Sequence, residues 1–201
     1  MPKEWILGTS DQNDMPLLRS IISESPLLSP ILHDWEKIAL PDCWLVAGAI
    51  AQTVWNRSFG LPATHGIADI DIVYFDAADL SESAEAEHTS RIRAVFPRLP
   101  AGIDVKNEAR VHLWYEAKLA CSIEPYTSAA DAITTFPTSA TAVGLRPRPE
   151  KWESCAPYGT SDLLGLIVRP NKKQITREIY KAKVNRWIAV WPELTVIDWD
   201  E

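Results

Sequence analysis

Residues 66–76 read GIADIDIVYFD, and this stretch decides how the chain is interpreted. Its hydrophobic residues alternate with polar ones and are mostly β-branched or aromatic, which predicts a β-strand. Successive side chains of a strand point to opposite faces, so Asp69 and Asp71 share one face while Ile70 and Ile72 share the other. Two carboxylates side by side next to a core repel each other unless a cation lies between them. The pair therefore predicts a divalent metal such as Mg²⁺, which prefers oxygen ligands.

A second short strand, residues 102–106, repeats this pattern. Asp104 and Lys106 lie on one face of it and apolar side chains on the other. If this strand pairs beside the first, Asp104 adds a third carboxylate to the same open face. Three acids can hold two metal ions, with Asp104 placed to help remove a proton from an attacking hydroxyl, and Lys106 would moderate the repulsion or contact phosphate. The alternative is a solvated strand edge without a metal.

Upstream, the sequence Val46-Ala47-Gly48-Ala49 predicts a strand that turns at glycine into a helix. The first turn of a helix has free backbone N–H groups and carries the positive end of the helix dipole, so it receives phosphate oxygens well. A plain turn is the alternative interpretation.

The rest of the chain alternates helices with short strands. Helices are expected over residues 16–24, 29–40, 49–59, 80–96, 128–135, 161–168 and 172–190, and strands over 45–47, 67–75, 102–106 and 140–145. Residues 107–119 can continue as a strand or form a helix. This order predicts an α/β (α+β) fold in which helices pack against a mixed sheet. We expect residues 1–40 to form an N-terminal helical segment packed on one domain, residues 41–201.

The amino-acid composition and the net charge exclude some classes of function. The chain has 201 residues, 46% of them hydrophobic, and a formal net charge of −7, which predicts a globular domain that coats neither DNA nor a membrane. Residues 166–190, however, hold seven basic side chains and one acidic one. This basic segment is either an ordinary solvated face or the far wall of a cleft that binds triphosphate or RNA.

Targeting signals are not visible. The three cysteines, Cys43, Cys121 and Cys155, form no CxxC pattern, and the chain has neither a secretory signal nor an apolar run long enough to span a bilayer. We therefore expect a reduced, cytoplasmic protein.

The candidate residues also carry a family resemblance. Gly48-Ala49, Asp69-Ile70-Asp71 and Ile103-Asp104-Val105 together resemble the glycine, Asp-x-Asp and third-acid pattern of the polymerase-β nucleotidyltransferase superfamily. More narrowly, residues 44–56, 68–76, 104–115 and 156–171 resemble a bacterial nucleotidyltransferase-like family.

This resemblance implies a fold, a reaction and roles for the acids. The fold is a mixed sheet with flanking helices, and the reaction transfers a nucleoside monophosphate from an NTP to a hydroxyl while pyrophosphate leaves. Asp69 and Asp71 would be ligands of two Mg²⁺ ions, with Mn²⁺ as a possible substitute, and Asp104 the third ligand and the base. The acceptor stays open between a small molecule, RNA and a protein hydroxyl.

One position departs from the superfamily pattern. Ala49 stands where the superfamily usually has Ser or Gly, so its side chain offers no hydroxyl to a phosphate. Together with the tryptophan-rich C-terminal tail, this supports an alternative, a catalytically degenerate nucleotide-binding or protein-interaction module on the same fold.

Further candidates for nucleotide binding are polar or aromatic residues near the same motifs. They are Trp55 and Asn56, to stack on and hydrogen-bond a base, and Asn107, Arg110 and His112, to line the cleft that contacts phosphate, sugar or base. Each of them also has a purely structural interpretation.

Overall fold

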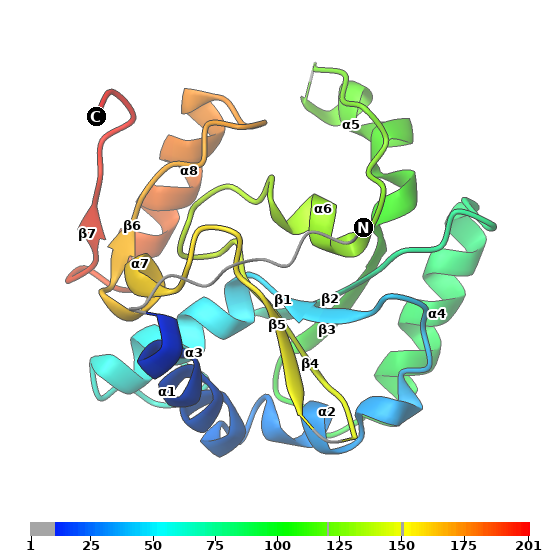
Figure 1. Cartoon of the computed structure of the whole chain (residues 1–201), viewed down its shortest axis with the longest axis horizontal. Helices are drawn as coiled ribbons and strands as arrows, with labels where there is room; N and C mark the ends of the chain where they lie inside the picture. Colours follow the sequence, from blue (N-terminus) through cyan, green and yellow to red (C-terminus); the bar gives the residue numbers. More distant parts are fainter. Residues whose placement is uncertain (1–10, 120, 150) are drawn as a thin grey trace.

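The computed structural model describes residues 11–119, 121–149 and 151–201, and a five-stranded mixed sheet lies at its centre (Figure 1). The strand order is β3-β2-β1-β4-β5. The strands are β1 (Trp44–Val46), β2 (Asp69–Tyr74), β3 (Gly102–Asn107), β4 (Gly144–Pro147) and β5 (Trp152–Cys155). β2 and β3 run parallel, and the other neighbours are antiparallel. A small parallel pair, β6 (Ile167–Val168) and β7 (Thr195–Val196), forms a separate sheet.

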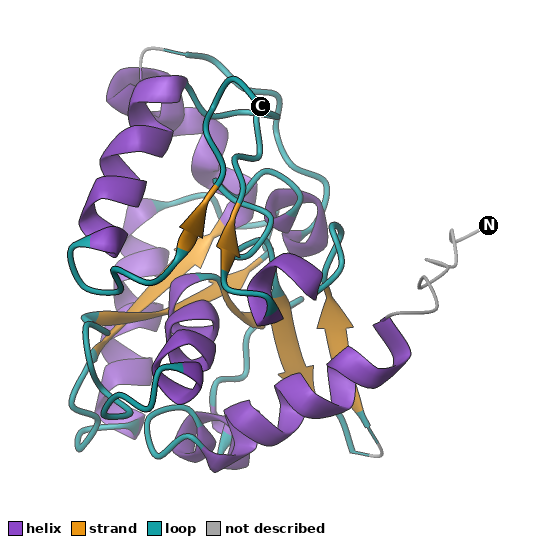
Figure 2. Cartoon of the chain, turned by 90° about the vertical axis from the view of Figure 1, so that its left-hand side faces the viewer, coloured by secondary structure: helices purple, strands orange, loops and turns teal. Residues whose placement is uncertain are grey.

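Helices cover both faces of the central sheet (Figures 1 and 2). They are α1 (Asp11–Glu24), α2 (Ser29–His33), α3 (Gly48–Ser58), α4 (Glu82–Val95), α5 (Val111–Leu119), α6 (Ala129–Ile133), α7 (Ser161–Leu164) and α8 (Arg177–Ile188), with 3₁₀ turns η1 (Trp35–Lys37) and η2 (Glu108–Arg110). None of the helices in the described residues is both long and apolar enough to cross a membrane.

The larger core lies on the face of the sheet that packs against α1, α3 and α4. Ile70 and Ile72 of β2 are fully buried there, in one cluster with Leu18 of α1, Ile50 of α3 and Ile92 of α4. Because α1 contributes to this cluster, residues 11–40 share the core of the rest of the chain.

The opposite face is covered only in part. Val73 of β2 packs with Val46 of β1 and with Ala129 and Ile133 of α6 in a smaller cluster. This cover does not extend over the start of β2, where Asp69 is exposed and Asp71 half-buried. The alternation of β2 thus separates a packed face from an open one.

Three tryptophans attach the C-terminal part to the core. The ring of Trp55 on α3 makes edge contacts with Trp187 at 5.5 Å and Trp191 at 5.2 Å between ring centroids. The indole N–H of Trp191 donates to Asn56 Oδ1 at 2.7 Å. These residues are buried, so Trp187 and Trp191 of the tryptophan-rich tail belong to the core and do not form a free partner-binding surface.

The expected fold class is confirmed, and several element boundaries are corrected. Residues 161–168 do not form one helix, because Leu166 has φ +58 and the chain continues as β6, which pairs with β7. The basic helix begins only at Arg177, where the hydroxyl of Thr176 caps it. The helix expected over 29–40 divides into α2 and η1, and the strand expected over 140–145 lies at 144–147.

Two segments were not assigned from the sequence. β5 was not expected, although it pairs with β4 over four residues. Residues 107–119, which the sequence left undecided, form the end of β3, then η2 and α5.

Candidate active site

The three predicted carboxylates lie on neighbouring strands. In the register of the sheet, Asp71 is paired with Asp104 of β3 on one side and with Val46 of β1 on the other. Neighbouring strands are about 4.8 Å apart, so Asp71 and Asp104 stand next to each other on the open face. Asp69 lies two residues earlier on the same face of β2. The prediction that β3 pairs beside β2 and adds a third acid is confirmed.

Among the residues that the structure describes, Asp71 forms no ion pair, and the nearby ion pairs join Lys106 to Asp104 and Glu85. Burial, then the charges of Asp69 and Asp104, raise the pKa of Asp71 to about 6. Lys106 takes part of the negative charge, because its Nζ lies 3.4 Å from Asp104 and 3.6 Å from Glu85. The face therefore holds a carboxylate that a cation would stabilise.

Lys183 approaches the same acids from α8. Burial and then the charge of Arg186 lower its pKa, while Asp71 and Asp69 act in the opposite direction. Lys183 is half-buried, whereas Lys181 and Arg186 on the same helix are exposed. The basic segment thus divides into a solvated face and one lysine turned toward the site.

The N-terminus of α3 lies beside Asp71. A Cβ placed on Gly48 would lie 3.8 Å from Asp71 Oδ2 and 3.4 Å from Gln52 Nε2. The first N–H groups of a helix have no partner inside it, so they are available to an anion next to the carboxylates. Ala49 is 1% exposed, so its methyl group packs in the core, and only its N–H can contribute to such a site.

The donor set fits a hard divalent cation in its chemistry. Three carboxylates on one face offer only oxygen ligands, which is what Mg²⁺ prefers. The pKa of Asp71 is raised mainly by burial and further by the charges of Asp69 and Asp104. Within residues 11–119, 121–149 and 151–201, however, no three His, Cys, Asp or Glu side chains converge closely enough to hold an ion. Binding would require side-chain rotation and the release of Asp104 from Lys106.

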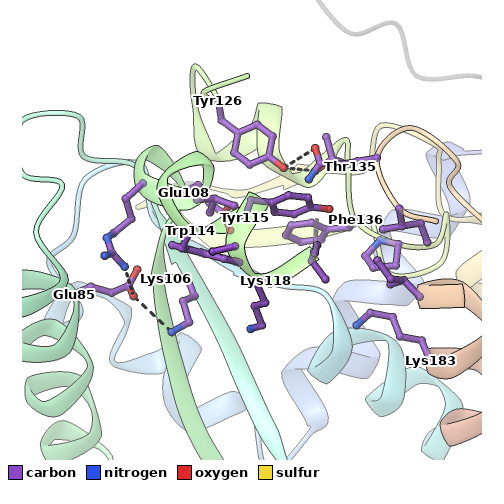
Figure 3. Close-up of a pocket in the computed structure, with 18 of the residues that line it drawn as sticks. Glu85, Lys106, Glu108, Trp114, Tyr115, Lys118, Tyr126, Thr135, Phe136 and Lys183 are labelled. Carbon is purple, nitrogen blue, oxygen red and sulfur yellow. Dashed lines mark hydrogen bonds and ion pairs between the residues drawn. The ribbon is translucent and has the colours of Figure 1, made fainter. Parts of the chain in front are cut away.

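A pocket of about 750 Å³ is lined in part by Lys106, the ion-pair partner of Asp104 (Figure 3). Lys106 connects the two regions, since it pairs with Asp104 and also lines the pocket. The walls include aromatic and basic side chains, among them Trp114, Tyr115, Tyr126, Phe136, Lys118 and Lys183. Pockets of this size accommodate a small molecule or one nucleotide.

Glu85 neutralises two basic groups of the pocket wall. Its carboxylate accepts a hydrogen bond from Arg110 Nη1 at 3.1 Å and another from the backbone N–H of Asn107 at 2.8 Å, and Lys106 lies 3.6 Å away. Arg110 also donates from Nε to the carbonyl of Leu80. Arg110 lines the pocket, but its charge is already paired with that of Glu85.

Glu108 also lines the pocket, and its environment differs from that of Glu85. Its side chain is 7% exposed. Burial is the main cause that raises the pKa of Glu108 to about 8, and the charges of Glu85 and Asp71 add to it. Glu108 is therefore mostly neutral at pH 7.

Four of the candidate nucleotide ligands lie outside this arrangement. Trp55 and Asn56 are 0% and 1% exposed and belong to the tryptophan cluster, so they cannot contact a base in this fold. The side chain of Asn107 bonds to the backbone of Asp76 and Asp79. His112 does not line the pocket. The predictions for Trp55, Asn56 and Asn107 are corrected, because these side chains are buried in contacts within the fold. The role of His112 stays a prediction.

Sequence reasoning missed several residues of the pocket. Glu108 carried a usable signal, since the alternation that places Asp104 and Lys106 on one face also places residue 108 there. Trp114, Tyr126, Phe136 and Lys183 come from separate segments, and no local pattern indicates that they meet.

Comparison with known proteins gives the class to which this fold belongs. A family model described as Nucleotidyltransferase matches residues 33–196. The match spans most of the chain, so the chain belongs to this nucleotidyltransferase family, and the resemblance noted in its motifs is confirmed.

The structure is also similar to a solved one. A protein whose NMR structure "reveals a CCA-adding enzyme head domain" superposes with a TM-score of 0.72 and 28% sequence identity, over 90% of this chain and 95% of that chain. No curated protein matches the sequence significantly.

Proposed function

We propose that this protein is a metal-dependent nucleotidyltransferase that transfers a nucleoside monophosphate from an NTP to a hydroxyl acceptor. The proposal rests on one observation: Asp71 stands between the N-terminus of α3 and Asp104, on the open face of the sheet. Family membership supports the reaction class. The similarity to a CCA-adding enzyme head domain supports it as well.

In this proposal, the two substrates bind on opposite sides of Asp71. On the β1 side, the first N–H groups of α3 and the ammonium of Lys183 would bind the triphosphate. On the β3 side, Asp104 would accept the proton of the acceptor hydroxyl. The acceptor oxygen then bonds to the α-phosphorus, the bond from that phosphorus to the bridging oxygen breaks, and pyrophosphate leaves.

Asp69, Asp71 and Asp104 would hold the divalent cation, which we propose to be Mg²⁺, two ions being implied by the family resemblance, with Mn²⁺ as a substitute. When bound, it neutralises phosphate charge and lowers the pKa of the attacking hydroxyl. Lys106 would exchange its contact with Asp104 for the one with Glu85, which is 3.6 Å away.

The acceptor is a hydroxyl of a small molecule, RNA or a protein. The pocket volume of about 750 Å³ beside Asp104 favours a small molecule or a single nucleotide end. We also propose a cytoplasmic location, because Cys43, Cys121 and Cys155 are free thiols.

Titration calorimetry with each NTP, with and without Mg²⁺, tests the proposal. We expect Mg²⁺-dependent binding in the wild type and its loss in the double variant Asp69→Asn/Asp71→Asn. Glu36→Gln serves as a matched control, because this acid is exposed and lies outside the site. If the folded wild type binds no NTP, or if the double variant binds as well as the wild type, the proposed function is wrong.

A further inference from the structure

Glu108 is a buried acid without a partner, and it faces the pocket. It is 7% exposed and lines the pocket wall. In the part of the chain that the structure describes, its carboxyl group takes part in no ion pair and no side-chain hydrogen bond, whereas nearby Glu85 has both Arg110 and Lys106. The carboxyl oxygens of Glu108 are not among the fully enclosed polar atoms that lack a hydrogen-bond partner, so they are open to the pocket, where a ligand can bind them.

The neighbouring walls suit a flat, aromatic ligand. Trp114 and Tyr115 stand together with ring centroids 6.0 Å apart, next to Glu108 (Figure 3). Tyr126 is fixed by hydrogen bonds of its hydroxyl with Thr135 and Gln174. Aromatic side chains held in this way bind nucleobases by stacking.

The protonation state of Glu108 determines which ligand edge it can bind. Burial raises its pKa to about 8, so at pH 7 the carboxyl group has one O–H donor and one carbonyl acceptor side by side. All four nucleobases have an edge with the matching pair, for example N3–H and O4 of uracil or N1 and the amino group of adenine.

We propose that this pocket binds a nucleobase, and that Glu108 forms a paired hydrogen bond with its donor–acceptor edge. This inference rests on the proposed function and extends it to the substrate. The base is that of the NTP or that of a nucleotide acceptor, since both have the same edge. The four bases should bind within a few-fold of one another, because Glu108 matches each of them.

Base analogues with a blocked edge test this contact. The ligands are uridine and 3-methyluridine, adenosine and N6,N6-dimethyladenosine, each free and as the 5′-triphosphate with Mg²⁺, measured by calorimetry at pH 7. Methylation removes the donor of the edge and leaves the stacking surface. We expect it to weaken binding about tenfold or more in the wild type, since a buried group is then left unpaired.

Variants of Glu108 test whether its side chain causes the loss of affinity on methylation. Glu108→Gln keeps one donor and one acceptor and should keep the penalty. Glu108→Leu has neither, so methylated and unmethylated ligands should bind it equally. Glu116→Gln on α5 is the matched control, because Glu116 is exposed and does not line the pocket.

Competition between an ATP analogue and adenosine shows whether the pocket binds the base of the NTP or that of the acceptor. If a non-hydrolysable ATP analogue with Mg²⁺ displaces adenosine, the pocket holds the donor base; if both bind together, it holds the acceptor base. A methylation penalty that is absent in the wild type, or unchanged in Glu108→Leu, overturns the inference. If NTP binding still depends on Mg²⁺ and on Asp69 and Asp71, the proposed function stands without it. If neither nucleosides nor NTPs bind, both are wrong.

Discussion

The two faces of β2 differ in what they contribute to the protein: one packs into the core, and the other carries acids. Ile70 and Ile72 on one face are 0% exposed and pack into the main core. On the other face, burial, and then repulsion by Asp69 and Asp104, raise the pKa of Asp71 to about 6. One face stabilises the fold, and the other holds like charges that we expect to reduce stability in the absence of a bound cation.

This difference is typical of a functional site. A protein selected only for stability would not place three acids on a partly buried face, because each ionised carboxylate loses solvation and repels the others. Substitutions on the packed face should therefore reduce stability, whereas substitutions on the open face should reduce activity and can increase stability.

The largest expected effect is on the packed face. Trp55→Ala removes a fully buried indole from the contacts with Trp187 and Trp191. We expect a loss of about 3–5 kcal/mol in the free energy of unfolding, measured by urea denaturation. Leu113→Ala, at a residue that is 57% exposed, is the control and should change stability little.

If Trp55→Ala does not fold, a matched pair of milder substitutions gives the same information. Trp191 donates its N–H to Asn56, whereas the N–H of Trp55 has no hydrogen-bond partner among the described residues. Trp191→Phe should therefore cost about 1–2 kcal/mol more than Trp55→Phe, because it leaves Asn56 Oδ1 unpaired. Equal losses would contradict this account of the cluster.

Gly48→Ala is the next largest expected effect, and it acts on activity. The added Cβ would meet Gln52 and Asp71 only at 3.4 and 3.8 Å, so the fold should accept it. It would occupy the space in front of the first N–H groups of α3, where we propose that phosphate binds. We expect kcat/KM for the NTP to fall roughly tenfold or more, which is about 1.4 kcal/mol.

Ser58→Ala, at the exposed far end of the same helix, should leave turnover unchanged. Full activity of Gly48→Ala in a protein of normal stability would show that phosphate does not approach this helix end.

Asp71→Asn should separate activity from stability. The folded protein holds the proton of Asp71 more tightly than the unfolded chain, because its pKa is about 6 instead of about 4. The stabilising contribution is present below pH 4 and is lost as the pH rises through 6. At pH 8 without divalent metal, we expect the variant to be more stable than the wild type by about 1–2 kcal/mol, and at pH 4 equally stable.

Urea denaturation at both pH values measures this difference, with Glu36→Gln as the exposed control. Added Mg²⁺ should stabilise the wild type and not the variant. A variant that is less stable than the wild type at pH 8 would mean that the open face has no uncompensated charge.

Strand β2 also shows how much of the site could be predicted from the sequence alone. Strand periodicity fixes which side chains share a face, so the grouping of Asp69, Asp71 and Asp104 followed from local pattern once β3 paired beside β2. The turn from β1 into α3 was predicted from Gly48, which follows a short apolar strand. The roles of these residues remain predictions, because a shared face does not establish a function.

Long-range contacts explain what the sequence did not reveal. The pocket combines side chains from η2, α5, α8 and the segments around Tyr126 and Phe136, and no local period relates them. Trp55 and Asn56 were misplaced in the cleft because a tryptophan near a helix end fits a core as well as a binding site. Only the packing of α8 on α3 shows that Trp55 belongs to the core and not to a binding site.

The smallest expected effect lies where β1 leaves the sheet and α3 begins. Ala47 has φ 56 and ψ −123, a conformation that side chains with a Cβ rarely adopt, and it is held by hydrogen bonds of its N–H with Val143 and of its carbonyl with Ala51. Ala47→Gly relieves this strain, so we expect a gain of about 0.5–1 kcal/mol in the free energy of unfolding.

Ala51→Gly should instead lower the free energy of unfolding. Residue 51 lies four residues later in regular helix, where glycine costs about 1 kcal/mol. Urea denaturation of the two variants side by side measures both signs under the same conditions. A loss of stability in Ala47→Gly similar to that in Ala51→Gly would mean that the turn stores no strain. The expected contrast in stability would show instead that the chain tolerates an unfavourable backbone conformation at Ala47, where the N-terminus of α3 is directed toward Asp71.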